Sequence, residues 1–153
     1  MTGKYIYGWF YSVLFGFIVL AIPLKSTISL AEKLYNPIPL TPNTEVNDTL
    51  TDGDIPTGEG GFSKDYVIQL EKGDQVSIDL KSEDFDSLVI LLGADGSTIG
   101  ENDDGPDGGT NSLLFSRITE GGKYIVRVRA FGETGGGKFK VKVTRLRPVD
   151  GKL

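Results

Sequence analysis

The sequence predicts an all-β fold, an antiparallel β-sandwich of the jelly-roll-like kind, preceded by an N-terminal apolar helix. Glycine supplies 21 of the 153 residues, roughly twice its usual share, and most glycines lie between apolar runs, as expected for many tight turns. Short segments between residues 46 and 147 alternate apolar and polar side chains, which is the period of a half-buried strand. No amphipathic helical pattern separates these segments, so packed sheets are predicted.

The N-terminal 31 residues contain an uncharged apolar run, Ile6–Leu24, between Lys4 and Lys25. A bilayer core needs about 20 apolar residues, so the run is just long enough to cross a membrane. It is interpreted either as an uncleaved signal anchor or as a signal peptide cut at Glu32 after the small residues of Ser29–Ala31. Both interpretations place the rest of the chain outside the cytoplasm, anchored to the membrane or released. A third alternative is a buried hairpin or helix.

Residues 32–45 are predicted to be a proline-containing linker. Pro37, Pro39 and Pro42 remove backbone donors and favour an extended path, which would act as a semi-rigid spacer. The alternative is a first edge strand with an irregular start. Residues 46–147 form the predicted sandwich, and 148–153 a C-terminal tail.

Five segments of the sandwich are predicted to be strands. Residues 65–70 (DYVIQL) and 75–80 (QVSIDL) alternate, whereas 87–93 (SLVILLG) is apolar throughout and is predicted to be a central strand covered on both faces. Residues 123–131 (KYIVRVRAF) and 138–145 (KFKVKVTR) alternate again, and 112–118 (SLLFSRI) is a further apolar segment.

The ADGS turn at residues 94–97 predicts a hairpin in which opposite residues have numbers summing to about 189–191. That register brings Asp86 opposite residues 103–105 and crowds several carboxylates at one end of the hairpin. Several carboxylates close together repel one another, which favours binding of a hard cation such as Ca²⁺ with its six to eight oxygen ligands. The candidate metal ligands are Asp84, Asp86, Asp103, Asp104 and Asp107. The pattern is not an EF-hand, and solvated turns at Asp-Gly pairs are the alternative.

Basic residues follow the acidic ones along the chain. The outward cations of the last two predicted strands are expected to form one basic sheet face, which could bind an anionic glycan or lipid headgroup. The simpler alternative is an ordinary solvated outer face. The candidate ligand-binding residues are Arg127, Arg129, Lys138, Lys140 and Lys142.

Composition excludes several functions. The net charge of −5 and pI near 4.7 disfavour a nucleic-acid partner. The chain has no histidine and no cysteine, so pairs such as Ser-His or Cys-His are excluded, and no enzyme activity is predicted. Residues 132–138 (GETGGGK) resemble half of a phosphate loop, but the hydroxyl residue is missing and a strand follows instead of a helix, so no nucleotide is expected and a hairpin connection is predicted.

The order of motifs is similar to that of the bacterial pre-peptidase C-terminal (PPC) domain family. The resemblance rests on DYVIQLEKGDQVSIDLKSEDFDSLVILLGADGSTIGENDD, NSLLFSRITEGGKYIVRVRAFG and GGGKFKVKV, within about Val46–Arg145. It implies a jelly-roll-like sandwich that is an accessory to secreted peptidases and is not catalytic. Some members of the family bind collagen or calcium.

The chain departs from the usual setting of this family because no peptidase domain precedes the resemblance. We therefore expect a free-standing exported binding module for a protein or polysaccharide ligand, with Ca²⁺ at the acidic loop and membrane contact through an uncleaved N-terminus. The alternative is a structural or adhesive domain of the cell envelope.

Overall fold

The computed structural model describes residues 35–132 and 135–146, together with Met1 and Gly3. The predicted N-terminal helix, most of the first 34 residues and the tail after residue 146 lie outside these residues. The chain divides into two units, and every described strand belongs to the second, Tyr35–Leu153. No helix that could cross a membrane occurs in the part of the chain described here.

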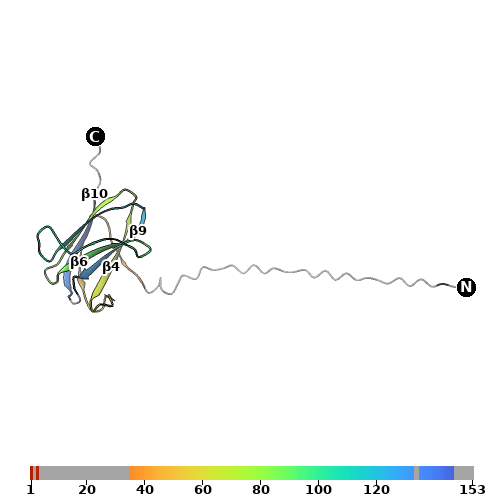
Figure 1. Ribbon diagram of the computed structural model, residues 1–153, viewed down its shortest axis with the longest axis horizontal. Coiled ribbons are helices and arrows are strands. Elements are labelled where there is room, and N and C mark those ends of the chain that lie inside the picture. Colours follow the sequence, from red (N-terminus) through yellow and green to blue (C-terminus); the bar gives the residue numbers. More distant parts are fainter. Residues whose placement is uncertain (2, 4–34, 133–134, 147–153) are drawn as a thin grey trace, which may run out of the picture. The chain divides into compact units, whose positions relative to one another are not determined.

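The described residues form ten strands. These strands make up two sheets, and Figure 1 shows how they are arranged. They are β1 (Ile38–Pro39), β2 (Glu45–Leu50), β3 (Ile55–Pro56), β4 (Phe62–Leu70), β5 (Gln75–Lys81), β6 (Ser87–Leu92), β7 (Thr98–Asn102), β8 (Ser112–Arg117), β9 (Gly122–Ala130) and β10 (Gly137–Leu146). The first sheet has the order β1-β4-β9-β6-β7, with β3 also paired to β4. The second has the order β2-β10-β5-β8.

The two sheets confirm the predicted all-β sandwich, and all strand pairs except the parallel β1–β4 pair are antiparallel. The jelly-roll connectivity is a finer description that stays a prediction. The core lies between the inward faces, where alternate residues of the predicted strands are buried. Tyr66 and Ile68 of β4 and Ile78 and Leu80 of β5 are at most 1% exposed.

Strand β6 is central in the first sheet, between β9 and β7. Val89 and Leu91 are fully buried on one face, and Ile90 and Leu92, on the other face, are 7% and 9% exposed. The prediction of a strand covered on both faces is therefore confirmed. The β6–β7 hairpin also has the predicted register, since Val89 pairs with Asn102 and Leu92 with Thr98.

Residues 35–43 lie against the sandwich, although 32–45 was predicted to be a linker. Ile38–Pro39 form β1 at the edge of the first sheet, which agrees with the edge-strand alternative. Leu40 is buried in the core, and the Asn43 N–H donates to the Val143 carbonyl of the second sheet. The segment therefore passes from one sheet to the other.

Candidate functional site

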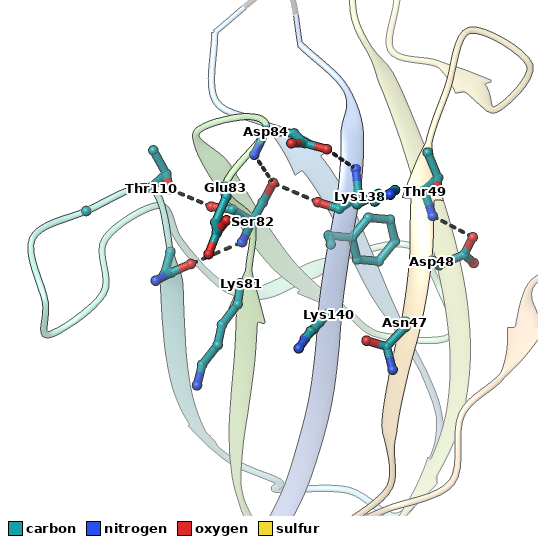
Figure 2. A pocket seen from close by; sticks show the side chains of 13 residues that line it. Asn47, Asp48, Thr49, Lys81, Ser82, Glu83, Asp84, Thr110, Lys138 and Lys140 are labelled. Carbon is teal, nitrogen blue, oxygen red and sulfur yellow. Dashed lines mark hydrogen bonds between the residues drawn. The ribbon is translucent and has the colours of Figure 1, made fainter.

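A groove of about 700 Å³ crosses the second sheet near one end of β2, β10 and β5. Figure 2 shows its side chains, which come from these three strands and from the two loops beside them. The lining residues are Asn47, Asp48, Thr49, Lys81, Ser82, Glu83, Asp84, Gly109, Thr110, Asn111, Lys138, Phe139 and Lys140.

The loop after β5 is fixed by the buried hydroxyl of Ser82. This hydroxyl donates to the Lys138 carbonyl at 2.9 Å and accepts from the N–H groups of Asp84 and Phe85 at 3.1 and 3.2 Å. The Asp84 carboxylate in turn accepts the Lys138 N–H at 2.7 Å. Two strand ends and a loop are thus held together by one hydroxyl and one carboxylate, as Figure 2 shows.

The glycines at the start of β10 and just before it allow this close approach. Gly137 has φ of 137°, and a Cβ atom there would collide with the side chain of Asp84. The motif that resembles a phosphate loop is therefore explained in part by packing. The predicted hairpin connection is wrong, because β9 belongs to the first sheet and β10 to the second.

The opposite wall is formed by the loop before β8. Thr110 donates its hydroxyl to the Ser82 carbonyl at 2.5 Å, and the Asn111 side-chain oxygen accepts the Ser82 N–H at 3.0 Å. The Asn111 amide donates to Asp107 at 2.7 Å. This hydrogen bond, with a second from the Gly109 N–H, lowers the pKa of Asp107 below its ordinary value.

Asp48 lies at the β2 side of the groove and is already engaged. It accepts hydrogen bonds from the Thr49 N–H at 2.7 Å, the Tyr66 hydroxyl at 2.8 Å and the Lys64 ammonium at 3.1 Å. Burial raises the pKa of Asp48, but these hydrogen bonds outweigh the burial and the net pKa is below its ordinary value. Burial, followed by the bond to Asp48, raises the pKa of Tyr66.

Three lysines have a different environment. Lys140 lies directly between Lys81 of β5 and Asn47 of β2, and Lys138 lies beside Thr49. None of the three forms an ion pair within the described residues. Like charges directly opposite each other destabilise an antiparallel pair, so the Lys81–Lys140 row carries a repulsion that a nearby negative charge would relieve.

The predicted acidic site is only partly assembled around this groove. Asp84 lines it, and Asp107 is linked to it through Asn111. Ladder pairing of β6 and β7 ends at Val89 and Asn102 and does not reach Asp86. The carbonyl of Asp104 instead accepts the N–H of Leu113.

Asp103 follows the end of β7 and is half-buried, whereas Asp86 is exposed. Across residues 35–132 and 135–146, no three acidic, histidine or cysteine side chains are spaced to hold a metal ion.

The strand order contradicts the prediction that the arginines and lysines share one basic sheet face. Arg127 and Arg129 lie on β9 of the first sheet, whereas Lys138, Lys140 and Lys142 lie on β10 of the second. Arg127 is bound to buried Asp65 by two hydrogen bonds of 2.8 Å.

Arg129 pairs with Glu59 at 3.1 Å. The prediction failed because it assumed that consecutive strands are neighbours, whereas this connection crosses between the sheets. Both arginines therefore have carboxylate partners of their own and are separated from the lysines.

Sequence reasoning missed Lys81 and the polar residues around it, Asn47, Ser82, Thr110 and Asn111. The outward position of Lys81 follows from the alternation of QVSIDLK. Its neighbour Lys140 is 59 positions away, so only the β5–β10 pairing reveals the contact.

Residues 62–130 match the sequence pattern of the bacterial pre-peptidase C-terminal domain. This segment of the chain is therefore of the PPC type. The resemblance noted in the sequence is therefore confirmed, and the matched residues run from the start of β4 to the end of β9. No curated protein matches the chain.

Several solved structures resemble this chain, and two of them show which fold it shares. The Aeromonas hydrophila protein PliG, a periplasmic inhibitor of g-type lysozyme, has 14% identity and a TM-score of 0.55, covering 72% of this chain and 96% of its own. The pre-peptidase C-terminal domain of a Bacillus anthracis collagenase has 13% identity and a TM-score of 0.52, covering 71% and 95%. At these identities the likeness shows a shared fold.

Proposed function

We propose that this chain is a non-catalytic, extracytoplasmic binding module whose ligand lies in the groove of the second sheet. The observation that carries the proposal is the meeting of Asp84, Lys138 and Lys140 in one groove. The sequence had assigned these residues to two unrelated surfaces. A recess lined by convergent polar side chains on rigid strands is the usual form of a binding site.

The similar proteins support this role. One is a periplasmic inhibitor of a lysozyme and therefore acts on another protein, and the other is the pre-peptidase C-terminal domain of a collagenase. The apolar run Ile6–Leu24 supports export, with membrane attachment where the run is retained. The ligand class is accordingly a protein or a polysaccharide outside the cytoplasm.

The chemistry of the groove supports binding without catalysis. Asp48 and Asp84 already accept hydrogen bonds from the protein, so neither is positioned as a free general base. With no histidine or cysteine in the chain, no common partner for an activated nucleophile is available.

Calcium binding belongs to the same proposal as a stabilising element. The oxygens of Asp103, Asp104 and Asp107 lie in a glycine-containing loop that also offers carbonyl groups, and Asp84 and Asp86 belong to the loop before β6. Thermal melting of the protein in Ca²⁺ and in a chelator tests this element. A higher midpoint in Ca²⁺ is expected, and identical midpoints would remove calcium from the proposal.

A second candidate function is adhesion to an anionic glycan or lipid of the cell envelope. The unpaired row of Lys81 and Lys140, with Lys138 beside it, favours this alternative. After the correction above, the basic surface consists of these residues and excludes the arginines.

The groove itself is tested by filling it. Asn47→Trp places a large side chain on an exposed strand position inside the groove, and Gln69→Trp does the same on the outer face of the first sheet. The purified protein is solubilised in detergent and mixed with detergent-washed cell envelopes, so that a retained membrane anchor cannot hold it there. Its sedimentation with the envelopes should be lost in the Asn47 variant and retained in the Gln69 variant. Equal sedimentation of both variants and the wild type would refute a role for the groove.

A further inference from the structure

The groove has basic residues along its strands and an acidic rim at one end. Lys81 and Lys140 face each other across β5 and β10, whereas exposed Glu83 and Asp84 belong to the loop that closes one end. Figure 2 shows Lys81, Lys140 and Asn47 along the strands and the acidic pair at the loop. Opposite charges thus occupy different parts of one recess.

From this arrangement we infer that the ligand is an acidic polysaccharide in which carboxylate-bearing sugars are separated by neutral ones, with one carboxylate held between Lys81 and Lys140. This inference rests on the proposed function, because it names the chemistry of the ligand in the same groove. It adds a two-lysine clamp that the sequence does not reveal.

The clamp follows from the register of the sheet. Residues directly opposite in an antiparallel pair have Cβ atoms about 4.5–5.5 Å apart, so two ammonium groups on flexible stems can reach one carboxylate. Asn47, on the other side of Lys140, adds amide donors and no charge. A bound carboxylate converts a repulsive pair into an ion pair shared by both lysines.

Lys142 provides an internal comparison on the same strand. It lies between Glu45 of β2 and Asp79 of β5, so its charge has acidic neighbours on both sides. Lys140 has a lysine and an amide in the corresponding positions. The pairing of like charges is therefore local to one row of the sheet and is not a property of all lysines on β10.

The acidic rim limits the charge density of the ligand. A polymer with a charge on every unit would place carboxylates beside Glu83 and Asp84, where like charges repel. Neutral sugar hydroxyls can instead donate hydrogen bonds to those carboxylates and to the Thr110 hydroxyl. Charged and neutral units in alternation match the clamp and the rim together.

The same features disfavour an acidic protein segment and a bilayer. Protein interfaces are anchored by exposed aromatic or aliphatic side chains. Phe139 is the apolar member of the lining and is only 2% exposed. A flat anionic bilayer would bring its headgroups against Glu83 and Asp84 as well as against the lysines, and the one apolar side chain that lines the groove, Phe139, is too buried to insert.

The experiment measures fluorescence anisotropy of a labelled hexasaccharide of alternating glucuronate and N-acetylglucosamine, using the full protein as purified from cells. The same oligosaccharide with its carboxylates reduced to alcohols is the ligand control. The double variant K81Q/K140Q is compared with K142Q, and each variant is first checked for an unchanged thermal melt. Vesicles containing phosphatidylglycerol and soluble poly-glutamate are measured in parallel.

We expect the wild type to bind the acidic oligosaccharide, and the double variant to bind it about tenfold more weakly, as two partly exposed ion pairs allow. K142Q should stay within about twofold, and the reduced sugar should lose about as much as the double variant. Equal losses in K142Q and K81Q/K140Q, or equal binding of the reduced sugar, would overturn the inference.

The inference would also be overturned if the wild type did not bind the acidic oligosaccharide. This holds even if the protein bound the vesicles or poly-glutamate through its lysines. The Asn47→Trp sedimentation assay separates this failure from that of the proposed function. If that variant loses envelope binding while the sugar is not bound, the groove remains the binding site and only the ligand chemistry is wrong.

Discussion

Replacing Asp65 with asparagine removes the negative charge that faces Arg127 on the outer side of the first sheet. The Asp65 side chain is 1% exposed and accepts two hydrogen bonds of 2.8 Å from Arg127 and one of 2.5 Å from the Tyr35 hydroxyl. Asparagine keeps the shape but turns one acceptor into a donor that points at other donors. The variant therefore leaves a cation without its partner.

The expected loss of stability follows from the burial of the two partners. Removing one member of a fully buried ion pair costs about 3–5 kcal/mol. Arg127 is 31% exposed, so water compensates part of that cost, and we expect about 2–3 kcal/mol. With the usual dependence of unfolding on urea, the midpoint should fall by about 1 M.

Glu59→Gln is the matched control, because Glu59 pairs with Arg129 on the same strand but is 71% exposed. Exposed pairs contribute about 0–1 kcal/mol, so this variant should change the urea midpoint little. The second test is Asp65→Asn combined with Arg127→Met, which removes both charges and should recover part of the loss. An Asp65→Asn midpoint equal to that of Glu59→Gln would refute the argument that burial sets the strength of these pairs.

Three further predictions concern single positions. Gly137→Ala should destabilise the fold by about 1–3 kcal/mol in urea unfolding, because φ is 137° and the new Cβ meets Asp84, whereas Gly122→Ala meets no atom within 4 Å. Lys140→Glu should stabilise the protein by about 0.2–1 kcal/mol, because the new carboxylate faces Lys81. Lys142→Glu should destabilise it by a similar amount, because it adds a negative charge between Glu45 and Asp79. Melting temperatures of the two variants that shift in the same direction would contradict the register. Burial, followed by the hydrogen bond to Asp65, raises the pKa of Tyr35 from 10.0 to about 12. The protonated Tyr35 hydroxyl therefore contributes fully to stability below pH 10, and this contribution is lost as the pH rises toward 12. In unfolding curves measured at alkaline pH, a Tyr35→Phe variant should lack the part of the stability loss that comes from this hydroxyl.

The strands were predictable because their signals are local. Alternation in residues 75–80 and the apolar run of β6 specify which side chains are buried, and the turn at Gly96, with φ of 82°, sets the register of its hairpin. These features depend on neighbours within a few positions. The sequence alone therefore sufficed for the sandwich and for most of its core.

The arrangement of the strands was not predictable in the same way. Arg127 and Lys140 lie on consecutive strands, yet the chain crosses to the other sheet between them. No local pattern distinguishes such a crossing from a hairpin, because both need a flexible glycine-containing connection. The error in the basic face and the omission of Lys81 have this single physical origin.

The position of the groove also limits what family membership can say about the ligand. The match to the PPC family ends at residue 130 and begins at residue 62, whereas Asn47, Lys138 and Lys140 lie outside that range and still line the groove. Only Lys81 and the two loops come from the matched part. Because the Lys81–Lys140 clamp needs one strand from inside and one from outside the match, two proteins can share the family pattern and differ at half of this site. The ligand therefore has to be inferred from the charges of this chain, and Lys140, more than any residue of the matched region, is the position at which relatives of different specificity are expected to differ.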